Sequence, residues 1–344
     1  MRQRLVVVGT TLVLGAAAAV ALQHAAGADP AAAPDGQVFM VNPVQSSGDE
    51  SLVDAKDSDS AVPAADYVKV PLRNLDGSGH LSGKYVVVRT STGKLADAAT
   101  GFVYTRSADQ FEQVMAYFWV NEAQEYIQSL GFGSDLRSVH ADQQPVRIDQ
   151  FGADNSFFTD QHAEIRYGKG GVDDAEDAEV IVHEYGHSVH ASQVPGFGSS
   201  EEAGAIGEAF GDYLAVSVGL AADDRYGWPM KTDPPCVADW DSTSYTPGPV
   251  HCLRSVDTDK TYADLDGEVH DDGEIWSRAL WDIRTALGDR TANRIIINAQ
   301  FGFAADTSFH DAALATINTA QQMNGNSAAK TVRAAFHARG IPGI

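Results

Sequence analysis

The pattern of hydrophobic and polar positions changes along the chain. Short apolar runs between Gly, Asn and Asp residues predict strands over 67–106 and 146–166, with hairpin turns in the first of these segments. Apolar residues instead recur every three or four positions over 177–192, 201–218 and 273–287, so these segments predict helices with one buried face. Further helices are predicted over 107–130, where Ser107 begins a capping box, and over 292–300, 309–323 and 327–339. The chain therefore predicts an α+β fold, rich in strands first and mainly helical afterwards.

The first 28 residues have the features of a signal peptide. Arg2 and Arg4 precede an apolar run from Leu5 to Leu22, and Ala26-Gly27-Ala28 has the small residues of a cleavage site. We therefore expect removal of residues 1–28 and secretion of the protein. An uncleaved membrane anchor is the alternative, because an apolar run of this length can just span a bilayer. The Ala, Gly and Thr residues of the run and the cleavage site favour removal.

The remaining chain is divided by composition. Residues 29–66 are rich in Ala, Asp, Ser and Pro and predict an acidic linker or partly ordered arm, with one candidate strand at 37–41. The rest of the chain is long enough for two lobes around one cleft, a β-rich lobe over 67–192 and a helical lobe over 193–344. The formal net charge of −23 disfavours nucleic acid and anionic membranes as partners. We expect a monomer that acts on proteins or peptides.

The segment His183-Glu-Tyr-Gly-His187 carries the most specific chemistry. Residues four apart on a helix lie on one face, so His183 and His187 can share one zinc ion. Glu184 lies beside them and can act on water bound to that metal. A chance match to this short motif is the alternative, but the predicted helix around it favours a metal site. His190 is a rival ligand that we place at the rim, because it lies about 10 Å along the helix from His183.

A catalytic zinc ion usually has three protein ligands, and Glu208 is the nearest strong candidate for the third. Asp212 follows four residues later on the same helical face, where it can accept a hydrogen bond from a ligand histidine. The alternative is an ordinary solvated acidic face. Glycines at 204, 207 and 211 would let this helix approach the first closely.

Four blocks in this order resemble the thermolysin-like (gluzincin) zinc metallopeptidases, and most of all the fungalysin-type branch and its bacterial relatives. The blocks are residues 154–158 with 164–168, 183–187, 203–212, and 267–276 with Leu280-Trp281. The resemblance implies a two-lobed fold, with a β-rich N-terminal lobe, a mainly helical C-terminal lobe and the zinc-binding helix between them.

The resemblance also implies roles for individual residues. They are zinc binding by His183, His187 and Glu208, general-base catalysis by Glu184, orientation of a zinc ligand by Asp212, donation to the oxyanion by His270, and substrate binding by Asn155, the backbone of Ser156 and Arg254. The chain departs from the family pattern in two respects. No tyrosine lies between the second zinc histidine and the third ligand, and Asp266, the best candidate to orient the catalytic histidine, is one residue out of place.

His270 also suits the oxyanion role on chemical grounds. It precedes Asp271 and Asp272, which can cap the predicted helix over 273–287, so the histidine would be held rigidly and remain exposed. A surface histidine in an acidic turn is the alternative.

Two further features concern stability. Cys236 and Cys252 predict a disulfide in an exported protein, whereas zinc binding by this pair and a thiol nucleophile are less favoured. Acidic clusters at 264, 266, 271 and 272, and at 173, 174, 176 and 177, leave calcium binding open. Neither cluster fits an EF-hand loop, so we expect a solvated acidic face at each.

These features together predict a secreted zinc-dependent endopeptidase. The alternative from another class is a non-catalytic metal-binding or cell-surface binding protein that retains the peptidase fold, but the presence of Glu184 favours catalysis. An exopeptidase is a third reading, for which we find no pocket that would bind an N-terminal amine.

Overall fold

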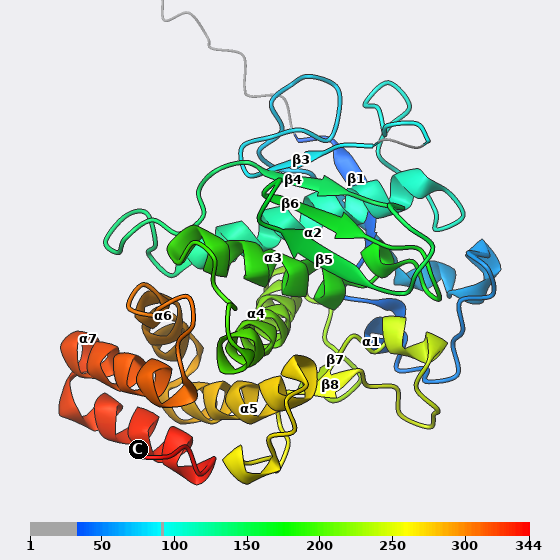
Figure 1. Cartoon of the computed structure of the whole chain (residues 1–344). Helices are drawn as coiled ribbons and strands as arrows, with labels where there is room; N and C mark the ends of the chain where they lie inside the picture. Colours follow the sequence, from blue (N-terminus) through cyan, green and yellow to red (C-terminus); the bar gives the residue numbers. More distant parts are fainter. Residues whose placement is uncertain (1–32, 91–92) are drawn as a thin grey trace, which may run out of the picture. The chain divides into compact units, whose positions relative to one another are not determined.

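The computed structural model describes residues 33–90 and 93–344, and Ala33–Ile344 forms one compact unit. The predicted signal peptide lies outside the described residues. The strands are β1 (Asp35–Phe39), β2 (Tyr67–Pro71), β3 (Val86–Val88), β4 (Gln144–Arg147), β5 (Ser156–Thr159), β6 (Glu164–Tyr167), β7 (Cys236–Val237) and β8 (Arg254–Ser255). The helices are α1 (Pro43–Ser47), α2 (Asp109–Ser129), α3 (Ala178–Gln193), α4 (Glu201–Tyr226), α5 (Val269–Leu287), α6 (Asp289–Gln300) and α7 (Phe309–Ala338) (Figure 1).

The largest sheet has four strands in the order β3-β4-β6-β5. The first three are parallel, and β5 pairs antiparallel with β6, with Ser156 opposite Tyr167. Strands β3 and β5 therefore lie at the two edges of this sheet. The topology corrects the expected hairpin turns in the first strand segment, because β2 pairs with β1 and β3 with β4.

Residues 33–66 differ from the predicted linker or arm. Strand β1 pairs antiparallel with β2, and Val38, Phe39 and Val41 are completely buried. The ring of Phe39 packs against Phe111 of α2, with ring centroids 4.7 Å apart. The part of this segment from Val38 to Val44 is therefore in the core. The composition predicted a linker or arm because this segment contains only one short apolar run within a polar stretch. That run is ordered by strands and helices that are distant in sequence.

Helices α2 and α3 pack beside the sheet, and α4 packs against α3 on one side and α5 on the other (Figure 1). Helices α5, α6 and α7 pack on one another. The prediction of an α+β fold with a sheet-containing first part and a helical second part is confirmed, and α3 lies where the two parts meet.

Two helix boundaries have local causes. The predicted capping box at Ser107 does not form, because α2 begins after Ala108 and the Ser107 hydroxyl donates to Asp59. The two predicted C-terminal helices are continuous except for a kink at Gly325, whose φ of 79° is not helical.

Helix α4 has the length and hydropathy of a membrane span, but 83% of the residues in its apolar window are buried inside the protein. Its apolar composition is therefore explained by its position between α3 and α5 in the core.

Candidate metal centre and cleft

Helices α3 and α4 carry the predicted metal ligands, and each helix begins at a side-chain cap. Asp177 accepts a hydrogen bond from the backbone of Glu179, and Ser200 accepts one from the backbone of Ala203. The two helices approach most closely at a pair of glycines. A Cβ atom at Gly186 would lie 2.8 Å from the Cα atom of Gly211. The expectation that glycine allows this close approach holds at Gly211.

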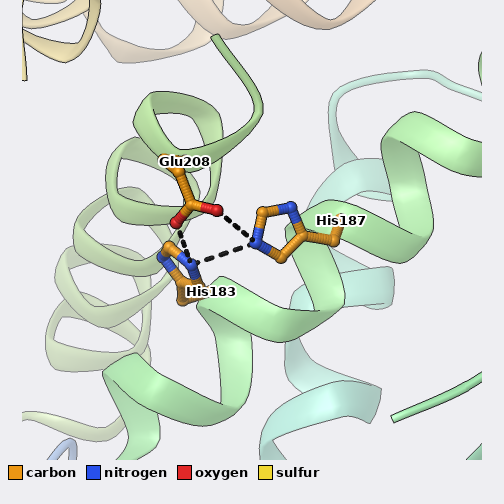
Figure 2. A group of neighbouring side chains, drawn as sticks. All are labelled: His183, His187 and Glu208. Carbon is orange, nitrogen blue, oxygen red and sulfur yellow. Dashed lines mark hydrogen bonds and ion pairs between the residues drawn. The ribbon is translucent and has the colours of Figure 1, made fainter. Parts of the chain in front are cut away.

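The three predicted ligands meet between these helices (Figure 2). His183 Nε2 lies 3.1 Å from His187 Nε2 and 3.1 Å from Glu208 Oε2, and His187 Nε2 lies 3.5 Å from Glu208 Oε1. Ligand atoms about 2.0–2.1 Å from a tetrahedral zinc ion would be about 3.3 Å apart. Two imidazole nitrogens and a carboxylate at these separations therefore fit zinc in both chemistry and spacing.

Asp212 orients the first of these histidines. Its Oδ1 lies 2.7 Å from His183 Nδ1, which leaves Nε2 of that ring directed at the other two ligands. Arg254 donates to both oxygens of Asp212, from Nε at 2.7 Å and from Nη2 at 2.8 Å. Arg254 thus contacts the carboxylate that holds the predicted ligand His183, and it also lines the cleft. Its contact with a substrate stays a prediction.

Burial and charge act differently on the two histidines. Burial lowers the pKa of His187 to about 4, so its imidazole is neutral, which is the form that binds a metal. Burial also lowers the pKa of His183, but the carboxylates of Asp212 and Glu208 outweigh it and raise that pKa to about 10 in the chain alone. A metal ion would therefore displace a proton from His183.

Glu184 lies next to the ligands and is 6% exposed. Burial raises its pKa to about 7, and a hydrogen bond from the backbone N–H of Phe158 in β5 acts in the opposite direction. Its Oε2 has no hydrogen-bond donor within the described residues. A carboxylate with a raised pKa and a free oxygen is suited to accept and return a proton.

A cavity of about 1060 Å³ connects the metal ligands with the sheet edge. Of the predicted site residues, those that line it are Asn155, Ser156, His183, Glu184, His187, Glu208, Asp212, Arg254 and His270. Phe157, Phe158 and Phe197 belong to its walls as well. Thus side chains from β5, α3, α4, β8 and α5 meet at one cleft.

His270 lies in the first turn of α5, with 52% of its side chain exposed. Its Nε2 is 3.5 Å from Glu208 Oε2, and its Nδ1 is 2.6 Å from Glu268 Oε1. The expected partner Asp266 is exposed and instead accepts a hydrogen bond from the backbone of Glu268. The predicted cap is also corrected, because Glu268, and neither aspartate after His270, accepts the bond from the helix backbone. Glu268 lies two residues before His270 in the same sequence block, so the sequence offered it as a candidate partner as well.

His190 is buried rather than at the rim. Its ring packs between Phe197 and Phe210, with ring centroids 4.3 and 4.6 Å away, and it lines the cavity. It is not part of the cluster formed by the three metal ligands.

The acidic segment before α3 is also buried, contrary to the solvated face that we expected. Asp173, Asp174, Glu176 and Asp177 are 9%, 2%, 0% and 0% exposed. Two of them have clear structural partners. Glu176 forms an ion pair with the buried guanidinium of Arg106 at 2.7 Å, and Asp177 caps α3. Spacing in the sequence does not reveal the partner of Glu176, because Arg106 is distant along the chain.

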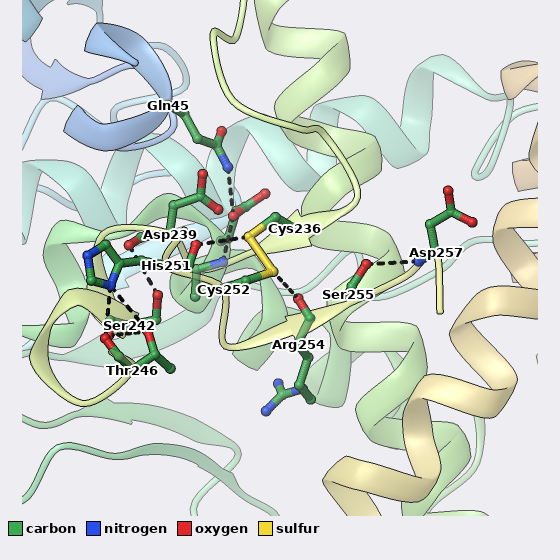
Figure 3. The surroundings of a disulfide bond; sticks show 12 residues. Gln45, Cys236, Asp239, Ser242, Thr246, His251, Cys252, Arg254, Ser255 and Asp257 are labelled. Atoms are coloured by element: carbon green, nitrogen blue, oxygen red, sulfur yellow. Dashed lines mark hydrogen bonds between the residues drawn. A yellow bond between two sulfur atoms is a disulfide. The ribbon is translucent and has the colours of Figure 1, made fainter. Parts of the chain in front are cut away.

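Cys236 and Cys252 form the predicted disulfide, with Cα atoms 5.4 Å apart (Figure 3). Cys236 lies in β7, whose Val237 pairs with Arg254 of β8. The bond therefore links β7 to the residues just before β8, the strand from which Arg254 reaches Asp212.

Comparison with known proteins agrees with this arrangement. Residues 77–342 match the family model of the fungalysin metallopeptidases (M36). An extracellular metalloproteinase, mep, of Aspergillus terreus is 30% identical over 132 residues, which are 34% of this chain and 19% of that protein. Extracellular metalloproteinase 2 of Trichophyton tonsurans is 29% identical over 124 residues, covering 33% of this chain and 18% of that protein. The matched region thus spans about a fifth of the length of these relatives.

A solved structure shows the fold. The precursor of protealysin, a metalloproteinase from Serratia proteamaculans, aligns with a TM-score of 0.54 and 17% identity over 78% of this chain and 92% of that chain. Two histidines and a glutamate on such a fold define the thermolysin-like class of metallopeptidases. The family match covers most of the chain, and the chain belongs to the fungalysin metallopeptidase family.

Proposed function

We propose that this protein is a secreted zinc-dependent endopeptidase. The observation that carries the proposal is the position of Glu184, a buried carboxylate with a free oxygen, beside three zinc-type ligands and in the same cleft as His270. His183, His187 and Glu208 would hold the zinc ion. When bound, zinc would lower the pKa of a water ligand from about 16 towards about 7 and polarise the peptide carbonyl.

The side chains around the metal would carry the proton transfers. Glu184 would accept a proton from the attacking water on its Oε2 and then pass it to the leaving amine. His270 would donate a hydrogen bond from Nε2 to the oxyanion. Since Glu268 accepts a hydrogen bond from Nδ1 of this ring, Nε2 can donate only when the ring is doubly protonated. The carboxylate of Glu268 would hold the ring in place.

The sheet edge explains how an extended substrate would bind. Strand β5 lies at the edge of its sheet and begins at Ser156, and Asn155 precedes it at the cavity wall. A peptide could add to this edge by backbone hydrogen bonds, which require no particular side chain. Because an added strand extends in both directions from the bond to be cleaved, this mode of binding favours cleavage within a chain.

The remaining parts of the proposal concern the setting. The names of the relatives from Aspergillus terreus and Trichophyton tonsurans describe extracellular proteins. Together with the signal-peptide pattern at residues 1–28 and a disulfide, this supports secretion. We further propose that the enzyme acts as a monomer on proteins or peptides, since one chain supplies the metal ligands, Glu184 and His270.

A comparison of the wild type with Glu184→Gln tests the mechanism. Both proteins should contain one zinc ion by elemental analysis, whereas only the wild type should digest casein, and a chelator should abolish that digestion. Mass spectrometry of the released peptides should show cleavage at internal bonds. Equal activity of the two proteins would contradict the role of Glu184. A wild type that retains zinc and cleaves no peptide would instead support the alternative, a metal-binding protein that keeps the fold.

A further inference from the structure

A second group of acidic residues lies in the wall of the same cavity. Asp154 precedes β5, Asp174 begins the short 3-10 helix Asp174–Glu176, and Asp241 begins the 3-10 helix Asp241–Ser244. Each offers one carboxylate oxygen, and the three oxygens lie within 4.8 Å of one another. Three separate segments thus place three carboxyl groups close together.

Two of these carboxylates have an oxygen that accepts no hydrogen bond from the described residues. Asp174 and Asp241 are 2% and 4% exposed, and Oδ1 of each is hidden from solvent without a hydrogen-bond donor among the described residues. Their other oxygens accept hydrogen bonds, from the Ser156 hydroxyl to Asp174 and from the Tyr245 hydroxyl to Asp241 at 2.7 Å. Among the described residues, no ion pair joins any of the three aspartates to a basic side chain.

A different acidic cluster, formed by Asp266, Asp271 and Asp272, has partners within the chain. Both oxygens of Asp272 accept backbone N–H groups, and Asp271 forms an ion pair with Lys260. That cluster is satisfied by the chain itself. Among the described residues, the cluster of Asp154, Asp174 and Asp241 has no ion pair of this kind, and its hydroxyl donors, Ser156 and Tyr245, leave Oδ1 of Asp174 and of Asp241 without a partner. Burial raises the pKa of Asp174 to about 7 and that of Asp154 to about 6.

We propose that Asp154, Asp174 and Asp241 bind a divalent cation of the calcium type. The donors are all oxygens, which calcium prefers, whereas zinc prefers nitrogen and sulfur. A cation at the centre of an equilateral triangle with 4.8 Å sides is about 2.8 Å from each corner. Calcium–oxygen distances of about 2.3–2.6 Å need only a slight contraction of such a triangle.

The position of the free oxygens favours an ion over a basic side chain of the substrate. Oδ1 of Asp174 and Oδ1 of Asp241 are both hidden from solvent. A small ion held among the three carboxylates needs no wide opening to the cleft, whereas a lysine or arginine side chain of the substrate would have to reach oxygens that solvent does not reach.

The ion would connect the substrate edge with the 3-10 helix Asp241–Ser244. Ser156 is the first residue of β5 and donates to Asp174, while Tyr245 donates to Asp241. A cation shared by Asp174 and Asp241 would hold these two segments at a constant distance. The site requires no peptidase activity, so it can be tested independently of the proposed function.

The test is calorimetric titration of calcium chloride into zinc-loaded protein in a buffer without chelators. The wild type should bind calcium with a dissociation constant on the order of 10⁻⁴ M, a value typical of extracellular sites. Asp241→Asn and Asp154→Asn should each lose one equivalent of binding. Asp259→Asn, which removes an exposed carboxylate elsewhere, should retain it. Asp154 is itself exposed, so its variant tests the site even if the buried substitution impairs folding.

Thermal unfolding provides a second measurement. Calcium at about a hundred times its dissociation constant should raise the Tm of the wild type and of Asp259→Asn by about 5 °C, and it should leave Asp154→Asn less affected. Equal calcium stoichiometry in all variants would overturn the proposal. It would also be overturned if no variant bound calcium and Asp154→Asn lost a preference for lysine or arginine beside the cleaved bond, because the cluster would then bind the substrate.

Discussion

The contact between α3 and α4 makes a sharp prediction for Gly211. An alanine there would place its Cβ atom 2.7 Å from His183 Nδ1, whereas ordinary contacts of this kind begin at about 3.4 Å. The histidine ring or the helix must therefore move by several tenths of an ångström. The added Cβ atom would clash with His183 Nδ1, the ring nitrogen that is hydrogen-bonded to Asp212.

The expected cost separates into stability and metal binding. Overpacking typically costs about 1–3 kcal/mol, and alanine recovers about 1 kcal/mol of helix propensity relative to glycine, so the loss of stability should be about 0–2 kcal/mol. Zinc sites tolerate deviations of only about 0.2 Å in their ligand distances. Because the displaced ring belongs to a ligand, we expect zinc affinity to fall by about 100-fold or more.

Gly207→Ala is the matched control on the same helix. Its Cβ atom would lie 3.7 Å from His187 Nδ1 and 3.7 Å from the ring of Phe197, which are ordinary contacts. This variant should keep its zinc affinity and gain up to about 1 kcal/mol from helix propensity.

Competition with a chromophoric chelator would give the zinc affinities, and thermal unfolding followed by circular dichroism would give the stabilities. If Gly211→Ala bound zinc as tightly as Gly207→Ala, the glycine contact would not be what positions His183, and the reasoning would fail.

Three further predictions concern the surroundings of the metal and the disulfide. Asp212→Asn should weaken zinc binding by about 10–100-fold, because the amide is neutral and a poorer acceptor for the ligand histidine; unchanged affinity in the same competition assay would argue against its orienting role. Glu268→Gln should lower kcat by about 10-fold while the helix cap is kept, whereas Asp266→Asn should have little effect on peptide hydrolysis. A larger loss of kcat in Asp266→Asn than in Glu268→Gln would instead support Asp266 as the residue that orients His270. Replacing Cys236 and Cys252 together by serine should lower the free energy of unfolding by about 3 kcal/mol, measured by denaturant titration, and an unchanged midpoint would show that the loop is held without the bond.

The local chemistry of the metal site could be predicted from the sequence. His183 and His187, and likewise Glu208 and Asp212, are four residues apart, and helix geometry places such pairs on one face whatever the rest of the fold does. The structure places all four together with Glu184. The disulfide followed from composition, because the chain has only two cysteines.

Other features depend on segments that the chain brings together from a distance. Glu268 rather than Asp266 reaches His270, because the first turn of α5 begins earlier than its acidic pair suggested. Strand β5 becomes the sheet edge only through its pairing with β6. These outcomes depend on where a helix starts and which strands are neighbours, and short-range patterns do not determine either.

The sequence by itself predicted the ligand pairs, the candidate general base and the class of chemistry, because each prediction depends on spacing within a single helix. Only the tertiary structure decided which acidic residues are buried. Asp174 and Asp241 lie in polar stretches of the sequence, yet they meet Asp154 in the wall of the cavity, and each keeps a buried oxygen without a partner among the described residues. The physical reason is that the cost of burying a charge depends on every group around it, and those groups come from parts of the chain far apart in sequence.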